Sequence, residues 1–360
     1  MTALVLRSIS SNVGLIGGAW MLSSSVLTTY YTNRFLKYDQ NTENIWRTSE
    51  SLTSLPTIMD STNEQASRYR VNPLPESLSR MMEFTFRSVS RAQLLTLFRF
   101  SISLFIGLLP NIGNRIIQTR KAVKFFMIPA LFLFIANYCN SIALERIGIS
   151  LTYTSKCAIP LVTVLLTLWT EGLTGLPPLS ALLSLIPIAV GIAMASWNSP
   201  VFELYGFVAA IVSTISQACL NIYSKKAMIV SKVGGLEAQR AMVCVALGIT
   251  ICMAFFNGIL NQGMKNEDSN HAYSASWKGI PPIHISMAAA VAYHIEYVLS
   301  FIFVKLVHPI SFGAVDAVRR LGIILAGRVM FGGEQFSTTN HVGVLMTLLG
   351  AFLYSLSMAK

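Results

Sequence analysis

The sequence contains little charge. Only 12% of its 360 residues are Asp, Glu, Lys or Arg, about half the share of a typical soluble domain. By contrast, 53% are hydrophobic and the mean hydropathy is +0.57. This composition indicates a polytopic membrane protein. The formal net charge is +11, but most basic residues lie in short segments between apolar runs, where they set membrane orientation. A nucleic-acid partner is therefore not expected.

Motifs for metal binding, glycosylation and catalysis are missing. The five cysteines lie inside apolar runs without metal-ligand spacing, and no N-x-S/T acceptor occurs. No HExxH, GxSxG, Walker or correctly placed GxGxxG motif is present either. His294 and Glu296 are the only neighbouring acid–base pair, and two positions apart on a helix they point in different directions. We expect no metal or cofactor and no enzyme, although a membrane-embedded enzyme or a scaffold without transport activity remains the alternative class.

Apolar runs recur at the length that a helix needs to cross a bilayer, about 20 residues. They are Val13–Tyr31, Ala92–Leu109, Phe125–Leu144, Leu151–Trp169, Leu179–Trp197, Val201–Tyr223, Ala241–Leu260, Ile283–Val304, Ile310–Met330 and Val342–Met358. A cleaved signal peptide is the alternative for the first run, because Arg7 precedes a short apolar core. The runs predict an all-α membrane protein of about ten transmembrane helices.

The chain divides into four segments. Residues 1–37 hold the N-terminus and first span, and residues 38–91 form a polar, Ser/Thr-rich insertion that we expect to be a loop. Residues 92–197 complete a first repeat, and residues 198–360 form a second. Basic residues collect in the loops of one side, among them Arg120, Lys121 and the Lys225–Lys226 pair. By the positive-inside rule both termini are expected to face the cytosol.

The two halves of the chain resemble each other. The first span ends in Tyr31-Thr32-Asn33-Arg34 and the sixth in Tyr223-Ser224-Lys225-Lys226, while Lys156 of the fourth span matches the place of Asp316 in the ninth. Five spans per copy is an odd number, so the copies must be inverted relative to each other. Inverted repeats are a transporter architecture with a substrate site at the midplane.

Six charged residues lie in the interior of predicted spans, away from the span ends, where such a residue is a functional hypothesis by default. They are Arg99 in the second span, Lys156 in the fourth, Glu296 in the eighth, and Asp316, Arg319 and Arg320 in the ninth. Two adjacent arginines at this depth suggest an anion site.

Each of these residues also has a structural interpretation. Lys156 could extend its stem to the membrane interface. Asp316 could form an ion pair with Arg319 or Arg320, and Glu296 could be held by Arg99 or by tyrosine hydroxyls on its own helical face. These alternatives stay open from the sequence.

Several segments carry a family resemblance. ISLTYTSKCAIP (Ile149–Pro160), NIYSKKAM (Asn221–Met228) and HPISFGAVDAVRRLGIILAGRVMFG (His308–Gly332) resemble the plastid-type phosphate translocators of the drug/metabolite transporter superfamily, to which the nucleotide-sugar transporters are related. The resemblance implies two inverted five-helix repeats, alternating access, and exchange of phosphate for phosphorylated organic anions. It further implies that Lys156 and the Arg319–Arg320 pair hold the phosphoryl group, since guanidinium forks bind phosphate oxygens bidentately.

This chain departs from the family pattern at several positions. Leu220 replaces an arginine, Glu296 stands at a site tyrosine, and Asp316 stands at a small polar position. Arg99 stands where relatives often carry histidine or glutamine, and Asn140 falls at a polar position of the third span. The candidate substrate-binding residues are therefore Lys156, Arg319, Arg320, Glu296, Asn140, Tyr297 and Arg99. Glu296 and Asp316 are also candidate proton-coupling groups.

The sequence therefore predicts a multi-pass antiporter for phosphate and phosphorylated organic anions such as triose phosphate, phosphoenolpyruvate or a sugar phosphate. A nucleotide-sugar/nucleoside-monophosphate antiporter is the alternative within the class. The expected partners are this small-molecule substrate and the lipid bilayer. The expected location is an organelle membrane, either the Golgi/ER endomembrane system or a plastid envelope.

Overall fold

The fold is entirely helical wherever the chain is described. The computed structural model describes residues 16–38, 90–109, 112–172, 177–197, 202–263, 281–306, 309–331 and 337–357. Residues 39–89, most of the predicted insertion, lie outside these ranges, as do the first 15 residues, on which the signal-peptide alternative depends.

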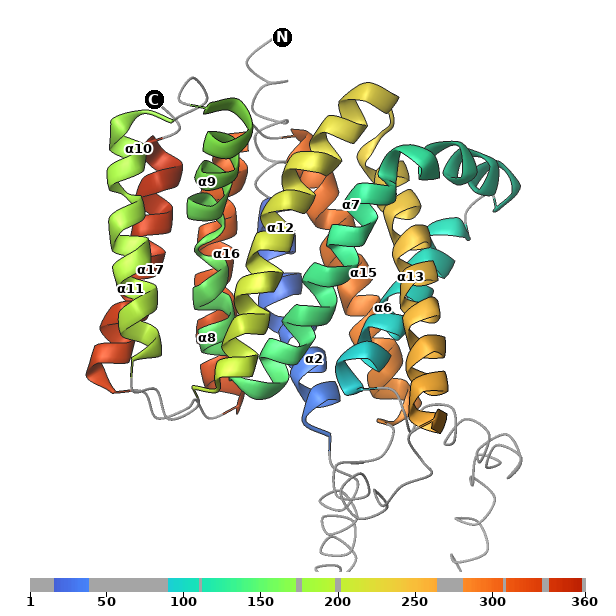
Figure 1. Cartoon of the computed structure of the whole chain (residues 1–360), viewed down its shortest axis with the longest axis horizontal. Helices are drawn as coiled ribbons and strands as arrows, with labels where there is room; N and C mark the ends of the chain where they lie inside the picture. Colours follow the sequence, from blue (N-terminus) through green and yellow to red (C-terminus); the bar gives the residue numbers. More distant parts are fainter. Residues whose placement is uncertain are drawn as a thin grey trace, which may run out of the picture.

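Ten helical segments follow one another along the described ranges, as predicted. The first joins residues 16–22, the π-helix η1 (Ser23–Thr28) and α2 (Thr29–Leu36), and the others are α6 (Arg91–Leu108), α7 (Ile112–Arg146), α8 (Gly148–Lys156) with α9 (Ile159–Glu171), α10 (Leu179–Leu183) with α11 (Leu185–Ser196), α12 (Leu204–Ser231), α13 (Gly235–Gly263), α15 (Ile283–Leu306), α16 (Pro309–Phe331) and α17 (Thr338–Ser357). Seven of these segments are long and apolar enough to cross a membrane by length and composition. Successive segments run in opposite directions, so the first begins and α17 ends on the same side (Figure 1).

The packing is nearly unchanged when the two halves of the chain exchange places. Helix α7 packs on α12 and α13, and its counterpart α15 packs on the first span and α6. The broken helix α8–α9 packs on α12, and its counterpart α16 packs on η1 and α2. Three further pairs, α6 with α13, α8 with α16 and α11 with α17, join equivalent helices directly. This exchange symmetry supports the predicted inverted repeat of five spans.

Two predicted helix boundaries were wrong. Helix α7 begins at Ile112, so Arg120 and Lys121 lie in its first three turns instead of in a loop, and this end of α7 crosses the top of the bundle (Figure 1). Helix α12 continues to Ser231, which places Lys225 and Lys226 inside a helix as well. Apolar composition marks only the membrane-spanning part of a helix, whereas backbone hydrogen bonding continues these two helices through basic residues beyond it.

The fourth span is broken in its middle, between α8 and α9. A residue at position 160 would normally donate its backbone N–H to the carbonyl of Lys156, four residues earlier. Pro160 has no N–H, so this bond is impossible, and α8 ends at Lys156. Cys157 and Ala158 form a tight turn before α9 begins, with Pro160 in the first helical turn, where proline is tolerated. The break exposes the Lys156 carbonyl to a partner outside its own helix.

The fifth and tenth spans are in backbone contact. A Cβ atom added at Gly343 of α17 would lie 2.4 Å from the backbone nitrogen of Ala195 in α11, so only glycine allows this approach. The Asn340 side chain donates hydrogen bonds to the carbonyls of Met194, Ala195 and Trp197 at the end of α11. Small residues at a helix contact and a side chain that satisfies terminal carbonyls are both typical of helix association in membranes.

Candidate functional site

Arg319 lies at the centre of a buried charge network. Its Nε and Nη2 donate to Oδ1 of Asp316, at 3.0 and 2.7 Å, and its Nη1 donates to Oε1 of Glu296 at 2.9 Å. The Trp20 ring of the first span lies 4.9 Å from the guanidinium carbon, a cation–π contact. The side chain is only 14% exposed. One guanidinium thus bridges two carboxylates from neighbouring helices, α15 and α16.

Arg320 connects the two repeats. Its Nη2 donates to Oδ2 of Asp316, and its Nη1 donates to the backbone carbonyl of Lys156. That carbonyl is the one that Pro160 leaves without a partner in its own helix. The break in α8–α9 and the arginine of α16 therefore complement each other. These two spans occupy equivalent places in the two repeats.

Lys156 has no acidic partner among the described residues. Its Nζ lies 5.7 Å from the centre of the Tyr153 ring, one turn earlier on α8, and no hydrogen bond of this ammonium group occurs in the described part of the chain. The partly buried side chain lies at the break of the fourth span, inside the bundle. This position does not support the alternative in which Lys156 extends to the membrane interface.

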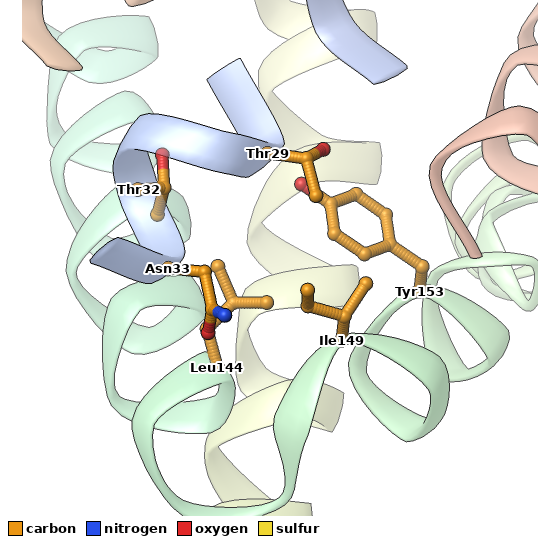
Figure 2. A pocket seen from close by; sticks show the side chains of 6 residues that line it. All are labelled: Thr29, Thr32, Asn33, Leu144, Ile149 and Tyr153. Carbon is orange, nitrogen blue, oxygen red and sulfur yellow. The ribbon is translucent and has the colours of Figure 1, made fainter. Parts of the chain in front are cut away.

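A small pocket lies beside Lys156. It is lined by Thr29, Thr32 and Asn33 of α2, Leu144 of α7, Ile149 and Tyr153 of α8 (Figure 2). The Tyr153 ring reaches from α8 toward Thr29, so the same ring lies under the Lys156 ammonium group and forms one wall of the pocket. The lining offers hydroxyl and amide groups together with aliphatic carbon, and none of the six side chains is charged.

Arg99 lies on the other side of this pocket. Its Nη2 donates to Oγ1 of Thr32, and its guanidinium carbon lies 5.2 Å from the centre of the Tyr293 ring. Arg99 is 3% exposed, and no acid pairs with it among the described residues. The structure thus differs from one alternative of the sequence analysis, because Glu296 pairs with Arg319 and not with Arg99.

The two candidate residues Tyr297 and Asn140 do not join the charge network directly. Tyr297 accepts a 3.3 Å hydrogen bond from Asn137 of α7, and its ring lies 4.3 Å from that of Tyr293. Asn140 is buried, and its Oδ1 has no partner among the described residues. Asn137, about one turn before the candidate residue Asn140 on α7, thus bonds α7 to α15.

Sequence reasoning missed Trp20, Thr32 and Tyr153. Trp20 and Thr32 come close to the arginines because the first span packs on α6, α15 and α16, whereas Tyr153 lies one turn before Lys156 on α8. The inverted repeat could have indicated the position of Trp20. It makes the first span the counterpart of α12, which packs on α8 and α9, and so places the first span against α16. No set of three His, Cys, Asp or Glu residues in the described ranges could hold a metal ion.

A duplicated bundle of ten helical segments around buried charges from both copies is typical of one class, the multi-pass membrane transporters with inverted repeats. Comparison with known proteins narrows this class. The model of the Triose-phosphate Transporter family matches residues 82–355, and the chain belongs to this family.

Individual relatives share about a quarter of their aligned residues with this chain. The chain is 26% identical over 225 residues to phosphoenolpyruvate/phosphate translocator 2, chloroplastic, of Arabidopsis thaliana, which covers 61% of this chain and 57% of the relative. Glucose-6-phosphate/phosphate translocator 2, chloroplastic, of the same plant is 25% identical over 221 residues, covering 61% and 55%. The xylulose 5-phosphate/phosphate translocator, also chloroplastic and from Arabidopsis thaliana, is 26% identical over 234 residues, covering 64% and 54%. The matches span little more than half the length of these relatives.

Proposed function

We propose that this protein is a secondary antiporter that exchanges inorganic phosphate for a phosphorylated organic anion. The main support is the hydrogen bond from Arg320 of α16 to the backbone carbonyl of Lys156 in α8, because it places a basic residue of each repeat at one helix contact inside the bundle. Ammonium and guanidinium groups are the side chains that bind phosphate best. Family membership and the names of the relatives support the same substrate class.

The internal carboxylates supply a mechanism for release. In the structure, Asp316 and Glu296 occupy the donors of Arg319 and Arg320. An arriving phosphoryl group competes with the Asp316 carboxylate, which bonds both arginines, and Asp316 takes these donors back when the anion leaves. Arg320 also donates to the Lys156 carbonyl of α8, in the other repeat, so an anion that draws Arg320 away changes how firmly the two halves hold together. Rocking of the halves about this point then exposes the site alternately to the two sides of the membrane.

The membrane we propose is an organelle envelope, with both termini on the cytosolic side. The relatives named above are all chloroplastic, which favours an envelope over the Golgi/ER system. The basic residues Arg120, Lys121, Lys225 and Lys226 lie at helix ends on the side of the bundle where α7 begins and α12 ends. Positive charge gathers on the cytosolic side of membrane proteins.

Counter-exchange in liposomes tests the proposal. The purified protein is reconstituted with phosphate inside the vesicles, and uptake of labelled phosphate, triose phosphate, glucose 6-phosphate and phosphoenolpyruvate is measured. Vesicles loaded with a nucleoside monophosphate are the parallel sample. We expect uptake driven by internal phosphate. Uptake driven only by the nucleoside monophosphate would instead identify a nucleotide-sugar exchanger, and turnover of a substrate in detergent would identify an enzyme.

A further inference from the structure

We infer that the site selects phosphate esters whose remainder is uncharged and rejects phosphate compounds that also carry a carboxylate, because Glu296 already supplies that carboxylate. This inference rests on the proposed exchange of phosphorylated anions and names the substrate class within it. Three features carry it: the occupied donors of Arg319, the charge left in the site, and the uncharged pocket beside Lys156.

The donors of Arg319 are occupied by internal acids. A guanidinium has five N–H donors in one plane, and three donor contacts of Arg319 go to carboxylate oxygens of Asp316 and Glu296. Glu296 reaches Arg319 from another helix, and both side chains are 14% exposed. A substrate that carried both a phosphoryl and a carboxylate group would need a cation for each. At Arg319, the donor that could bind a substrate carboxylate already bonds the Glu296 carboxylate.

The charge remaining in the site matches one phosphoryl group. The described spans bring together four basic side chains (Arg99, Lys156, Arg319, Arg320) and two acidic ones (Glu296, Asp316), a formal excess of two positive charges. The acids pair with the arginines of α16, so the unpaired cations are Lys156 and Arg99. A phosphate ester carries up to two negative charges near neutral pH. A further carboxylate would add a third negative charge beside Glu296 with no cation left to neutralise it.

The small pocket that shares Tyr153 with Lys156 has, among its described lining residues, no charged side chain that could neutralise a substrate carboxylate. Its walls include the side chains of Thr29, Thr32, Asn33 and Tyr153 (Figure 2). These groups donate and accept hydrogen bonds without contributing charge. Because the Tyr153 ring contacts both the pocket and the Lys156 ammonium group, a phosphoryl group at Lys156 would direct its ester toward this wall.

Competition in the exchange assay tests the inference. Labelled phosphate uptake is measured while unlabelled dihydroxyacetone phosphate, glucose 6-phosphate, phosphoenolpyruvate or 3-phosphoglycerate competes. We expect the two uncharged-remainder esters to inhibit at concentrations about tenfold lower than the two carboxylated compounds, the effect of one unfavourable buried charge contact. Glu296→Gln keeps the size of the side chain and an amide oxygen for Arg319 but removes the charge, so it should reduce this difference by about tenfold.

Glu203→Gln is the matched control, because Glu203 forms an exposed ion pair with Arg146 outside the charge network, and it should leave the preference unchanged. Equal inhibition by all four compounds in the wild type would overturn the inference, as would an unchanged preference in Glu296→Gln. The ligand-induced shift in unfolding temperature, measured with the same four compounds in detergent, gives the preference even if the variant transports poorly. Absence of exchange with every compound would instead overturn the proposed function.

Discussion

At the scale of single residues, the central feature is the pairing of acids with the arginines of α16. Asp316 accepts hydrogen bonds from both Arg319 and Arg320, and the three side chains are largely buried. A buried ion pair is weak evidence for stability as a unit, but removing one partner leaves an uncompensated charge. Asp316 therefore has two roles, since it neutralises the arginines and it competes with the substrate for them.

Asp316→Asn separates these two roles. We expect the variant to be less stable by about 3–5 kcal/mol, the usual cost of breaking a buried pair, and to bind phosphate more tightly because arginine donors become free. The measurement is the unfolding temperature in detergent with and without phosphate. The shift that phosphate causes should be larger in the variant than in the wild type. A variant with wild-type stability and an equal phosphate shift would contradict this assignment, and Glu203→Gln again serves as the control.

The sequence predicted which residues are charged inside the membrane, but not how they pair. Ionisable residues in apolar runs stand out by composition alone, so Lys156, Arg319 and Glu296 were recognised directly. Whether Glu296 meets Arg99 or Arg319 depends on the rotation and depth of α15 relative to its neighbours. The sequence of one apolar segment does not determine either quantity. For the same reason Trp20 and Thr32, which lie in an ordinary apolar span, could not be identified as contacts of the arginines.

At the scale of elements, the break in the fourth span is the main device. Pro160 removes the N–H that would bond to the Lys156 carbonyl, and Arg320 takes that carbonyl from the opposite repeat. Pro160 lies inside the predicted fourth span, but an apolar run of spanning length predicts one continuous helix. Only the structure relates the missing hydrogen bond to an arginine on another helix.

Pro160→Ala tests this link. Alanine restores the N–H, so the Lys156 carbonyl gains a partner in its own helix and Arg320 loses one. We expect slower exchange with little change in thermal stability, since proline is tolerated in the first helical turn and the Lys156 carbonyl exchanges one hydrogen-bond donor for another. Exchange and unfolding are measured on the same preparation. Pro178→Ala, at the exposed start of α10, is the control, and wild-type exchange by Pro160→Ala would show that the link has no role in transport.

The contact of α11 with α17 gives a second prediction at this scale. A Cβ at Gly343 would lie 2.4 Å from the backbone of α11, so Gly343→Val must push the helices apart. Overpacking of this kind costs about 1–3 kcal/mol, and we expect a lower unfolding temperature in detergent. Gly248→Val makes the same exchange on α13, where no atom lies within 4 Å of the added Cβ. If both variants unfold at the same temperature, the backbone contact does not stabilise the fold.

At the scale of the whole molecule, the fold was largely predictable and the site was not. Apolar runs fix the number of spans because the bilayer thickness sets helix length, and an odd number of spans per copy requires inversion. The exchange symmetry of the packing agrees with that argument. The ends of α7 and α12 were missed because helices continue beyond the bilayer, where apolar composition no longer marks them.

The central claim is that phosphate passes through the cations gathered where α8 meets α16. The most direct measurement is phosphate counter-exchange by Lys156→Gln in liposomes, compared with Lys225→Gln, which removes an exposed charge at the end of α12. A charge-assisted hydrogen bond contributes about 1.5–3 kcal/mol, so Lys156→Gln should slow exchange by about tenfold or more while Lys225→Gln remains near the wild-type rate. Exchange at the wild-type rate by Lys156→Gln would contradict the account.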